Sequence, residues 1–469
     1  MSESPQSYPP VLASVGDDKS FKDHVKATLI LGLPLVGAQV AQMAIGVTDT
    51  IMIGWLGAQP LAAGVLGTQL FFMVYIFGAG LAFAVIPISA NALGSGDERA
   101  VRRCVRMGLW AVTLFSVFGV AVMMQSNTIY IFLGQELENI VLAGDYLGVA
   151  MWGLLPALLG TALRSFLTAL ELARIVLLAT IGGVILNIML NYVLIFGHFG
   201  APRLELVGAA WASVGTQTLI LVILIVYIYM KKQTSEYGIF SRIWIADWPA
   251  MWELVRLGTP MSIAILAEVG LFHAASIMMG WIGTIPLAAH GVALQIAAVA
   301  FMIPLGFGNA ATVRIGNAFG KNNIPAVGRA GYSALFVVLL ITLFVALLLL
   351  FFPHYLSSLF LDLSNPDAAL VLAYAVPLVL VASAFQFADS MQGVLIGALR
   401  GLKDINVPMR LGIFSYWLVG VPAAYILAFP LNLGGVGLWI GLAFGLTVAA
   451  VLLLWRFYHR ERLGLLRPA

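Results

Sequence analysis

Long apolar stretches, separated by short polar ones, fill almost the whole chain. A helix of about 20 apolar residues crosses about 30 Å of hydrocarbon, because each residue adds about 1.5 Å. The pattern therefore predicts an all-α polytopic membrane protein with twelve transmembrane helices. The predicted spans are residues 27–56, 61–92, 107–126, 141–163, 175–197, 206–230, 254–281, 285–313, 330–353, 368–398, 406–429 and 435–457.

The polar positions between these spans predict the orientation. All of the 24 lysines and arginines except Arg203 fall in the two tails or in loops on one side of the membrane. Basic loops stay in the cytoplasm, so we expect both termini to be cytoplasmic. The first 26 residues lack an apolar stretch, so we expect no cleavable signal peptide.

The apolar pattern repeats itself once. LGLPLVGAQVAQ from Leu31 aligns with LGTPMSIAILAE from Leu257 at an offset of 226 residues, and the offset becomes 229 farther along. Six spans per copy give both lobes the same orientation, as in the parallel repeats of some transporters. Pro34 and Pro260 are repeat mates and are predicted hinges. The predicted domains are a tail at 1–26, a lobe at 27–230, a linker at 231–253, a lobe at 254–457 and a tail at 458–469.

Composition excludes one water-soluble core. The chain is 61% hydrophobic and 10% charged, whereas soluble domains carry about 25% charged residues. The net charge of +3 arises from the loops, so it gives no reason to expect a nucleic-acid partner. Cys104 is the one cysteine, which excludes a disulfide within the chain.

Three carboxylates interrupt the spans: Asp49, Glu268 and Asp389. We place no lysine or arginine deep in a span, so these acids have no basic partner there. A charge at the bilayer centre costs at least about 2.5–3.5 kcal/mol on insertion scales. Such a carboxylate keeps its proton or binds a metal cation, and both describe a cation site. The alternative is a protonated carboxyl that simply bonds neighbouring helices.

The repeat shows an asymmetry between the lobes. Glu268 aligns with Gln42, and Asp389 aligns with Gly160, so the C-terminal lobe carries two acids where the N-terminal lobe is neutral. The N-terminal lobe has Asp49 and also Asn187 and Asn191, which are four residues apart and share a helix face. The asparagines are either packing contacts or part of a substrate cavity. Phe385 precedes Asp389 by four residues and lies on the same face.

Two motifs that are missing from the sequence bear on the energy source for transport and on enzyme activity. The sequence has no GxxxxGK[ST] phosphate loop and no HExxH motif, so we expect transport driven by an ion gradient, no enzyme activity and no cofactor. A lipid-linked precursor flippase is one alternative, and it would favour basic residues in the cleft. An intramembrane hydrolase using Asp389 and Asp49 is another, which the repeat disfavours because catalysis does not need two equivalent lobes.

Several motifs together resemble the multidrug and toxic compound extrusion (MATE) family, closest to its bacterial NorM-type branch. The resemblance covers roughly residues 25–455. The motifs are VTDTIMIGWLG from Val47, ALGSGDERAVRR from Ala92, NIMLNYVLIFG from Asn187, LAEVGLF from Leu266, PLAAHGVALQIAAVAFMIPLGFGNAATVRIGNAFG from Pro286 and QFADSMQGVLIGALRGLKD from Gln386.

The resemblance implies a fold, a function and site residues. The fold would be two six-helix lobes with a V-shaped central cleft, in the bacterial inner membrane. The function would be secondary active efflux of organic, often cationic and amphipathic compounds in exchange for H⁺ or Na⁺. Glu268 and Asp389 match the family's cation-site acids, Asp49 matches its first-helix acid, and Asn187 and Asn191 match polar residues lining the N-terminal lobe.

Two positions depart from the pattern of the branch. Phe385 stands where a tyrosine is frequent, and Gly291 stands where a glutamine is frequent. Phe385 supplies no oxygen ligand, so we expect H⁺ rather than Na⁺ as the coupling ion. If the ion is Na⁺, Glu268 and Asp389 would hold the metal. We expect a monomer whose partners are small amphipathic molecules and membrane lipid.

Overall fold

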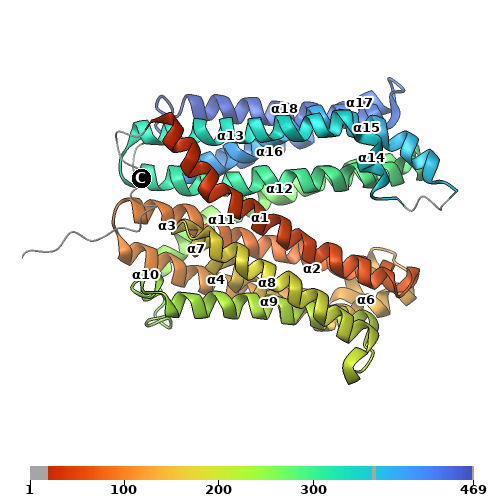
Figure 1. The fold of residues 1–469 in the computed structure, drawn as a ribbon, viewed down its shortest axis with the longest axis horizontal. Coiled ribbons are helices and arrows are strands. Elements are labelled where there is room, and N and C mark those ends of the chain that lie inside the picture. The colour runs from red at the N-terminus through yellow and green to blue at the C-terminus, as the bar shows by residue number, and fades with distance from the viewer. Residues whose placement is uncertain (1–19, 362–365, 467–469) are drawn as a thin grey trace, which may run out of the picture. The chain divides into compact units, whose positions relative to one another are not determined.

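The computed structural model describes residues 20–361 and 366–466, which form helices joined by short connections (Figure 1). Residues 1–19 of the predicted tail 1–26, including Lys19, lie outside the described residues, as do residues 467–469 of the predicted tail 458–469, including Arg467.

Within the described ranges, twelve helical segments are long and apolar enough to cross a membrane, which confirms the all-helical, twelve-span prediction. The single-helix spans are α1 (Phe21–Gly54), α4 (Glu98–Met123), α8 (Ala173–Phe196), α9 (Glu205–Met230), α11 (Trp248–Ile282), α12 (Thr284–Gly320), α13 (Ile324–Phe351), α15 (Ala368–Gly401) and α18 (Gly434–Tyr458). The broken spans are α2 (Ala58–Phe83) with α3 (Val85–Gly94), α6 (Leu137–Ala150) with α7 (Leu154–Ala169), and α16 (Asn406–Ile413) with α17 (Val421–Ala428). Short helices outside the spans are α5 (Ser126–Phe132), α10 (Lys232–Ser235) and α14 (Pro353–Ser358).

The repeat extends to the helix caps. Asp97 begins α4 by accepting the Ala100 backbone N–H at 2.9 Å, and its repeat mate Asn323 begins α13 by accepting the Ala326 N–H at 3.0 Å. Short oxygen-bearing side chains at this position satisfy backbone donors that a helix leaves unpaired. The same local chemistry therefore starts equivalent helices in both copies.

The helices form two compact units whose bounds differ from those of the predicted lobes. Among the described residues, unit 1 is Gly37–Ser262, and unit 2 is 20–36 together with 263–361 and 366–466. The start of α1 thus belongs to unit 2, whereas the linker and the start of α11 belong to unit 1. Each boundary lies two residues after a predicted hinge proline, Pro34 or Pro260.

The start of α1 packs in unit 2 and the start of α11 packs in unit 1, and we call these segments the exchanged helix starts. Close backbone contacts explain the exchange. In unit 1, a Cβ on Gly80 of α2 would lie 2.7 Å from the Ser262 backbone nitrogen. In unit 2, a Cβ on Gly306 of α12 would lie 2.6 Å from the Val36 backbone nitrogen. The two glycines are repeat mates, and so are Ser262 and Val36. Small residues let helix backbones approach closely within a membrane.

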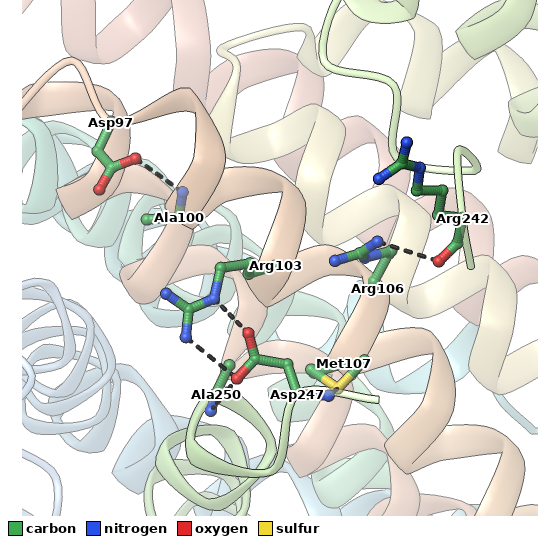
Figure 2. Close-up of polar contacts among 8 residues, drawn as sticks. All are labelled: Asp97, Ala100, Arg103, Arg106, Met107, Arg242, Asp247 and Ala250. Carbon is green, nitrogen blue, oxygen red and sulfur yellow. Dashed lines mark hydrogen bonds and ion pairs between the residues drawn. The ribbon is translucent and has the colours of Figure 1, made fainter. Parts of the chain in front are cut away.

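The linker is fixed to α4 within unit 1 (Figure 2). Arg102, Arg106 and Trp110 follow one another at four-residue steps, so they share a face of α4. Their donors bond linker carbonyls: Arg102 Nε to Tyr237 O (2.6 Å), Arg106 Nη1 to Ser241 O (3.3 Å) and Arg242 O (3.0 Å), and Trp110 Nε1 to Ile243 O (2.7 Å). Arg103 adds an ion pair with Asp247. We call this set of contacts the linker clamp.

Candidate functional site

In unit 1, Asp49 of α1 is the centre of a polar cluster. Its Oδ1 accepts from Asn187 Nδ2 at 2.9 Å and from Asn191 Nδ2 at 2.6 Å, and its Oδ2 accepts from Ser213 Oγ at 2.7 Å. The asparagines lie on α8 and the serine on α9. The structure therefore brings together the three residues that the sequence pointed to and adds Ser213, which sequence reasoning missed.

Gln42 belongs to a second polar contact, two helical turns before Asp49 on α1. Its Oε1 accepts from Arg164 Nη1 at 2.7 Å, while Arg164 Nη2 donates to Thr161 Oγ1 at 2.9 Å. Arg164 lies inside α7, five residues before its end at Ala169. α7 therefore continues past residue 163, the predicted end of that span, and its last turns include Arg164.

In unit 2, the two predicted acids come from different helices. Glu268 lies on α11 and Asp389 on α15, and Glu268 Oε1 accepts from Gln392 Nε2 at 2.9 Å. Glu268 is near enough to Asp389 for its charge to act on that residue. Asp389 is only 3% exposed, and its Oδ1 has no hydrogen-bond partner within the described part of the chain. A buried oxygen of this kind is satisfied when it holds a proton or a cation.

Two further residues act electrostatically on the unit 2 acids. Arg400 lies in the last turn of α15, and its charge acts on Glu268. Tyr416 lies in a π-helical segment, Phe414–Gly420 (η4), which interrupts the eleventh span. Tyr416 also acts on Arg400. The offset of 229 pairs Tyr416 with Asn187, so the repeat contained a signal for this position.

Phe385 forms part of an apolar wall in unit 2. Its ring is 1% exposed and packs edge-on against Phe272 at 6.3 Å and Trp439 at 5.7 Å between centroids. Trp439 Nε1 donates to His290 Nδ1 at 3.1 Å. An indole nitrogen only donates, so His290 Nδ1 is the acceptor and the Nε2 that faces Ser276 Oγ carries the ring proton.

The described residues contain no group of three or more His, Cys, Asp or Glu side chains arranged to hold a metal. Glu268 and Asp389 supply two carboxylates, so a Na⁺ ion there would take further oxygens from amides, hydroxyls, backbone or water. A proton, by contrast, needs no further ligand, so Glu268 and Asp389 can hold one by themselves.

Comparison with known proteins decides the family. The MatE family model matches residues 34–193 and 260–426, and the two matches start at the repeat mates Pro34 and Pro260. The chain belongs to the MATE family. The double match also supports the internal repeat inferred from the sequence.

Relatives place this MATE protein in the NorM-type branch. It is 48% identical to "Probable multidrug resistance protein NorM" of Rhizobium meliloti (strain 1021), over 96% of this chain and 97% of that one. It is 46% identical to the protein of the same name in Agrobacterium fabrum (strain C58 / ATCC 33970), over 93% and 94% of the two chains.

Solved MATE structures share the fold. A structure described as an outward-facing conformation of a multidrug resistance MATE family transporter superposes with a TM-score of 0.86 over 99% of this chain and 100% of that one, at 22% identity. The eukaryotic MATE transporter AtDTX14 superposes with a TM-score of 0.82 over 95% and 99%, at 21% identity. At these identities the likeness concerns the fold alone.

Proposed function

We propose that this chain is a secondary active multidrug efflux transporter that exchanges cytoplasmic organic compounds, often cationic, for an inward-moving cation by alternating access. The observation that carries the proposal is the acid pair of Glu268 and the buried Asp389, whose Oδ1 has no hydrogen-bond partner among the described residues. The names of the curated relatives support efflux of drugs as the task. We propose no catalytic step and no cofactor.

The two acid sites take different roles in this proposal. In unit 2, an incoming cation neutralises Glu268 and Asp389, which removes the cost of a charge in the membrane. In unit 1, three donors occupy three of the roughly four acceptor positions of the Asp49 carboxylate. The remaining position is free for a substrate ammonium, which makes Asp49 with Asn187 and Asn191 a substrate site.

Pro34 and Pro260 act as the hinges of the proposed exchange. A proline inside a helix removes one backbone hydrogen bond and bends the axis. Both prolines lie within continuous helices, α1 and α11, that pass from one compact unit to the other just after them. Bending at these positions lets the units move without unfolding a helix.

We propose an inner-membrane protein, active as a monomer, with both termini in the cytoplasm. The distribution of basic residues among the connections supports this orientation. Many large apolar side chains are exposed along the spans, as expected for contact with lipid tails.

We propose H⁺ as the coupling ion. Phe385 and its aromatic neighbours make one wall near Asp389 apolar, and Phe385 offers no oxygen. A dry carboxyl holds its proton more firmly, which suits proton exchange near neutral pH. Na⁺ held by Glu268 and Asp389 is the alternative.

Efflux from proteoliposomes tests both the function and the ion. With purified protein and a fluorescent lipophilic cation, a ΔpH without Na⁺ is expected to drive export, whereas a Na⁺ gradient without ΔpH is not. Phe385→Tyr is expected to add a response to Na⁺. Export that requires Na⁺ would overturn the proton assignment, and no export under either gradient would overturn the antiporter.

A further inference from the structure

A chain of hydrogen bonds runs through unit 2 beside the apolar wall that contains Phe385. His290 of α12 is at its centre and is 1% exposed. Trp439 Nε1 of α18 donates to His290 Nδ1, so the ring donates from Nε2 to Ser276 Oγ of α11 at 3.1 Å. Ser276 Oγ in turn donates to Phe272 O at 3.0 Å. The chain therefore joins three helices, and His290 uses both ring nitrogens in it.

Both ends of this chain pack against Phe385. The rings of Trp439 and Phe272 lie edge-on to it, at 5.7 Å and 6.3 Å between centroids. Phe385 precedes Asp389 by one turn on the same face of α15, and both side chains are buried. A ring that is held from two sides has little freedom to move, so it keeps water away from Asp389.

The repeat shows that these rings are particular to the unit with the acid pair. Unit 1 has only small residues at the equivalent positions: the mates of Phe272, His290 and Trp439 are Gly46, Gly64 and Ala210. The mate of Ser276 is Thr50, which makes the equivalent bond, to Gly46 O at 2.9 Å. The hydroxyl therefore belongs to the helix packing common to both units, whereas the imidazole and the indole are additions next to the acids.

We infer that His290 is a positioning residue of the coupling-cation site, Glu268 with Asp389: it fixes Trp439 and thereby holds Phe385 beside Asp389. Without His290, the buried Trp439 N–H would lose its acceptor, which favours another position of the indole. Phe385 would then lose one of its two supports and water would reach Asp389. A carboxylate that water solvates holds a cation less firmly. This inference rests on the proposed efflux function and adds to it a residue that sets the strength of cation binding.

Export at a series of cation concentrations tests the inference. The rate of export of a fluorescent lipophilic cation from proteoliposomes is measured against H⁺ concentration without Na⁺ and, separately, against Na⁺ concentration at fixed pH. His290→Leu removes both ring nitrogens, and His290→Asn keeps an amide oxygen that can replace Nδ1 as the acceptor. The control is Thr312→Val, which removes another bond from α12 to α15, between Thr312 Oγ1 and Gly397 O at 2.8 Å, 22 residues after His290.

His290→Leu is expected to raise the half-saturating concentration of the coupling cation about three- to tenfold, the effect of one lost hydrogen bond, and to change the maximal rate less than twofold. His290→Asn should raise this concentration less than His290→Leu does. Thr312→Val should lower the melting temperature and leave the half-saturating concentration unchanged. An unchanged half-saturating concentration with His290→Leu, or an equal rise with Thr312→Val, would overturn the inference.

A double variant separates positioning from a general loss of stability. Phe385→Leu alone should also raise the half-saturating concentration, and adding His290→Leu to it should give no further rise, because His290 acts through Phe385. Full additivity of the two effects would contradict the inference. If His290→Leu does not fold, Trp439→Phe takes its place, since it removes the same hydrogen bond and keeps an aromatic ring. Normal export with unchanged half-saturation in the variants would remove this inference alone, whereas no export by the unaltered protein under either gradient would remove the proposed function with it.

Discussion

At the scale of single residues, the sites differ in how completely their acids are hydrogen-bonded. Asp49 has three donors from α8 and α9, whereas Asp389 keeps one buried oxygen that has no partner in the part of the chain that the structure describes. In a low-dielectric interior an unsatisfied oxygen costs far more than it does in water. We therefore assign the exchange of the coupling cation to Asp389 and its neighbour Glu268.

Neutralising either unit 2 acid should uncouple transport. We expect Glu268→Gln and Asp389→Asn each to abolish gradient-driven efflux, because a neutral amide cannot exchange a proton. Both variants should still insert, because an amide is easier to place in the membrane than a carboxylate. Drug resistance of cells and efflux from proteoliposomes, at matched amounts of protein, measure the effect. Normal resistance with either variant would show that the residue only supports the fold.

The sequence predicted some residues of the sites and missed others for a physical reason. A carboxylate in an apolar span stands out because its cost is large, so Asp49, Glu268 and Asp389 could be found from the sequence. Ser213 and Gln392 could not, because uncharged polar side chains are common in spans and only their distance to an acid gives them a role. Arg164 was assigned to a loop because its position depends on where α7 ends.

At the scale of helices, the close contacts between Gly80 and Ser262 and between Gly306 and Val36 fix the exchanged starts of α11 and α1. In each case two of the three nearest atoms belong to the backbone, which cannot rotate away as a side chain can. These contacts therefore require glycine at positions 80 and 306, because a Cβ at either position would overlap the facing helix.

Gly80→Ala is expected to destabilise the protein by about 1–3 kcal/mol, because the new methyl overlaps the backbone of Ser262 and Gly258. Gly306→Ala should behave similarly. Gly46→Ala is the control: it lies in α1 with nothing within 4 Å, and alanine there should be neutral or stabilising by up to about 1 kcal/mol. Thermal unfolding of the purified protein measures the three. Equal melting temperatures for Gly80→Ala and Gly46→Ala would contradict the packing argument.

The linker clamp should respond to acid. The hydrogen bond from Arg103 lowers the pKa of Asp247, so the ion pair stabilises the clamp at every pH above the ordinary aspartate range. This stabilisation disappears as pH falls through the lowered pKa, below about 4. Asp247→Asn should loosen the linker already at neutral pH, while an asparagine can still accept the Ala250 N–H that starts α11.

Limited proteolysis of the linker measures this effect. Since exposed ion pairs are worth at most about 1 kcal/mol, we expect cleavage of Asp247→Asn to be up to about fivefold faster than that of the unaltered protein. Glu236→Gln, which removes the exposed pair with Lys232, is the control and should cleave at the normal rate. Cleavage of Asp247→Asn that equals the control at pH 7 would show that the backbone contacts alone hold the linker.

At the scale of the whole molecule, the architecture could be predicted because membrane insertion imposes simple rules. Apolar length gave the twelve spans, and the offset of 226 residues gave the repeat that the family model also matches. The bounds of the compact units were not visible, because the sequence marks where a helix passes through lipid and not which neighbours it packs against. Pro34 and Pro260, each two residues before a boundary between the units, were the only residues in the sequence that indicated where those boundaries lie.

The orientation is tested by labelling. A cysteine at Ser235, in the linker, is expected to react with a membrane-impermeant maleimide only after cells are opened, because the linker lies on the basic side. Cys104 is buried and gives a low background. Labelling of intact cells would reverse the proposed orientation of all twelve spans.

The exchanged helix starts also have a consequence for the order in which the chain is made. Unit 1 is complete once Ser262 has been synthesised, but the start of α1, which belongs to unit 2, must wait for α12. Some 270 residues separate Val36 from the glycine it packs against, which at 5–20 residues per second is a wait of roughly 15–55 s. Through most of translation, the first helix therefore stands in the membrane with one half folded into its own unit and the other half still without its partners.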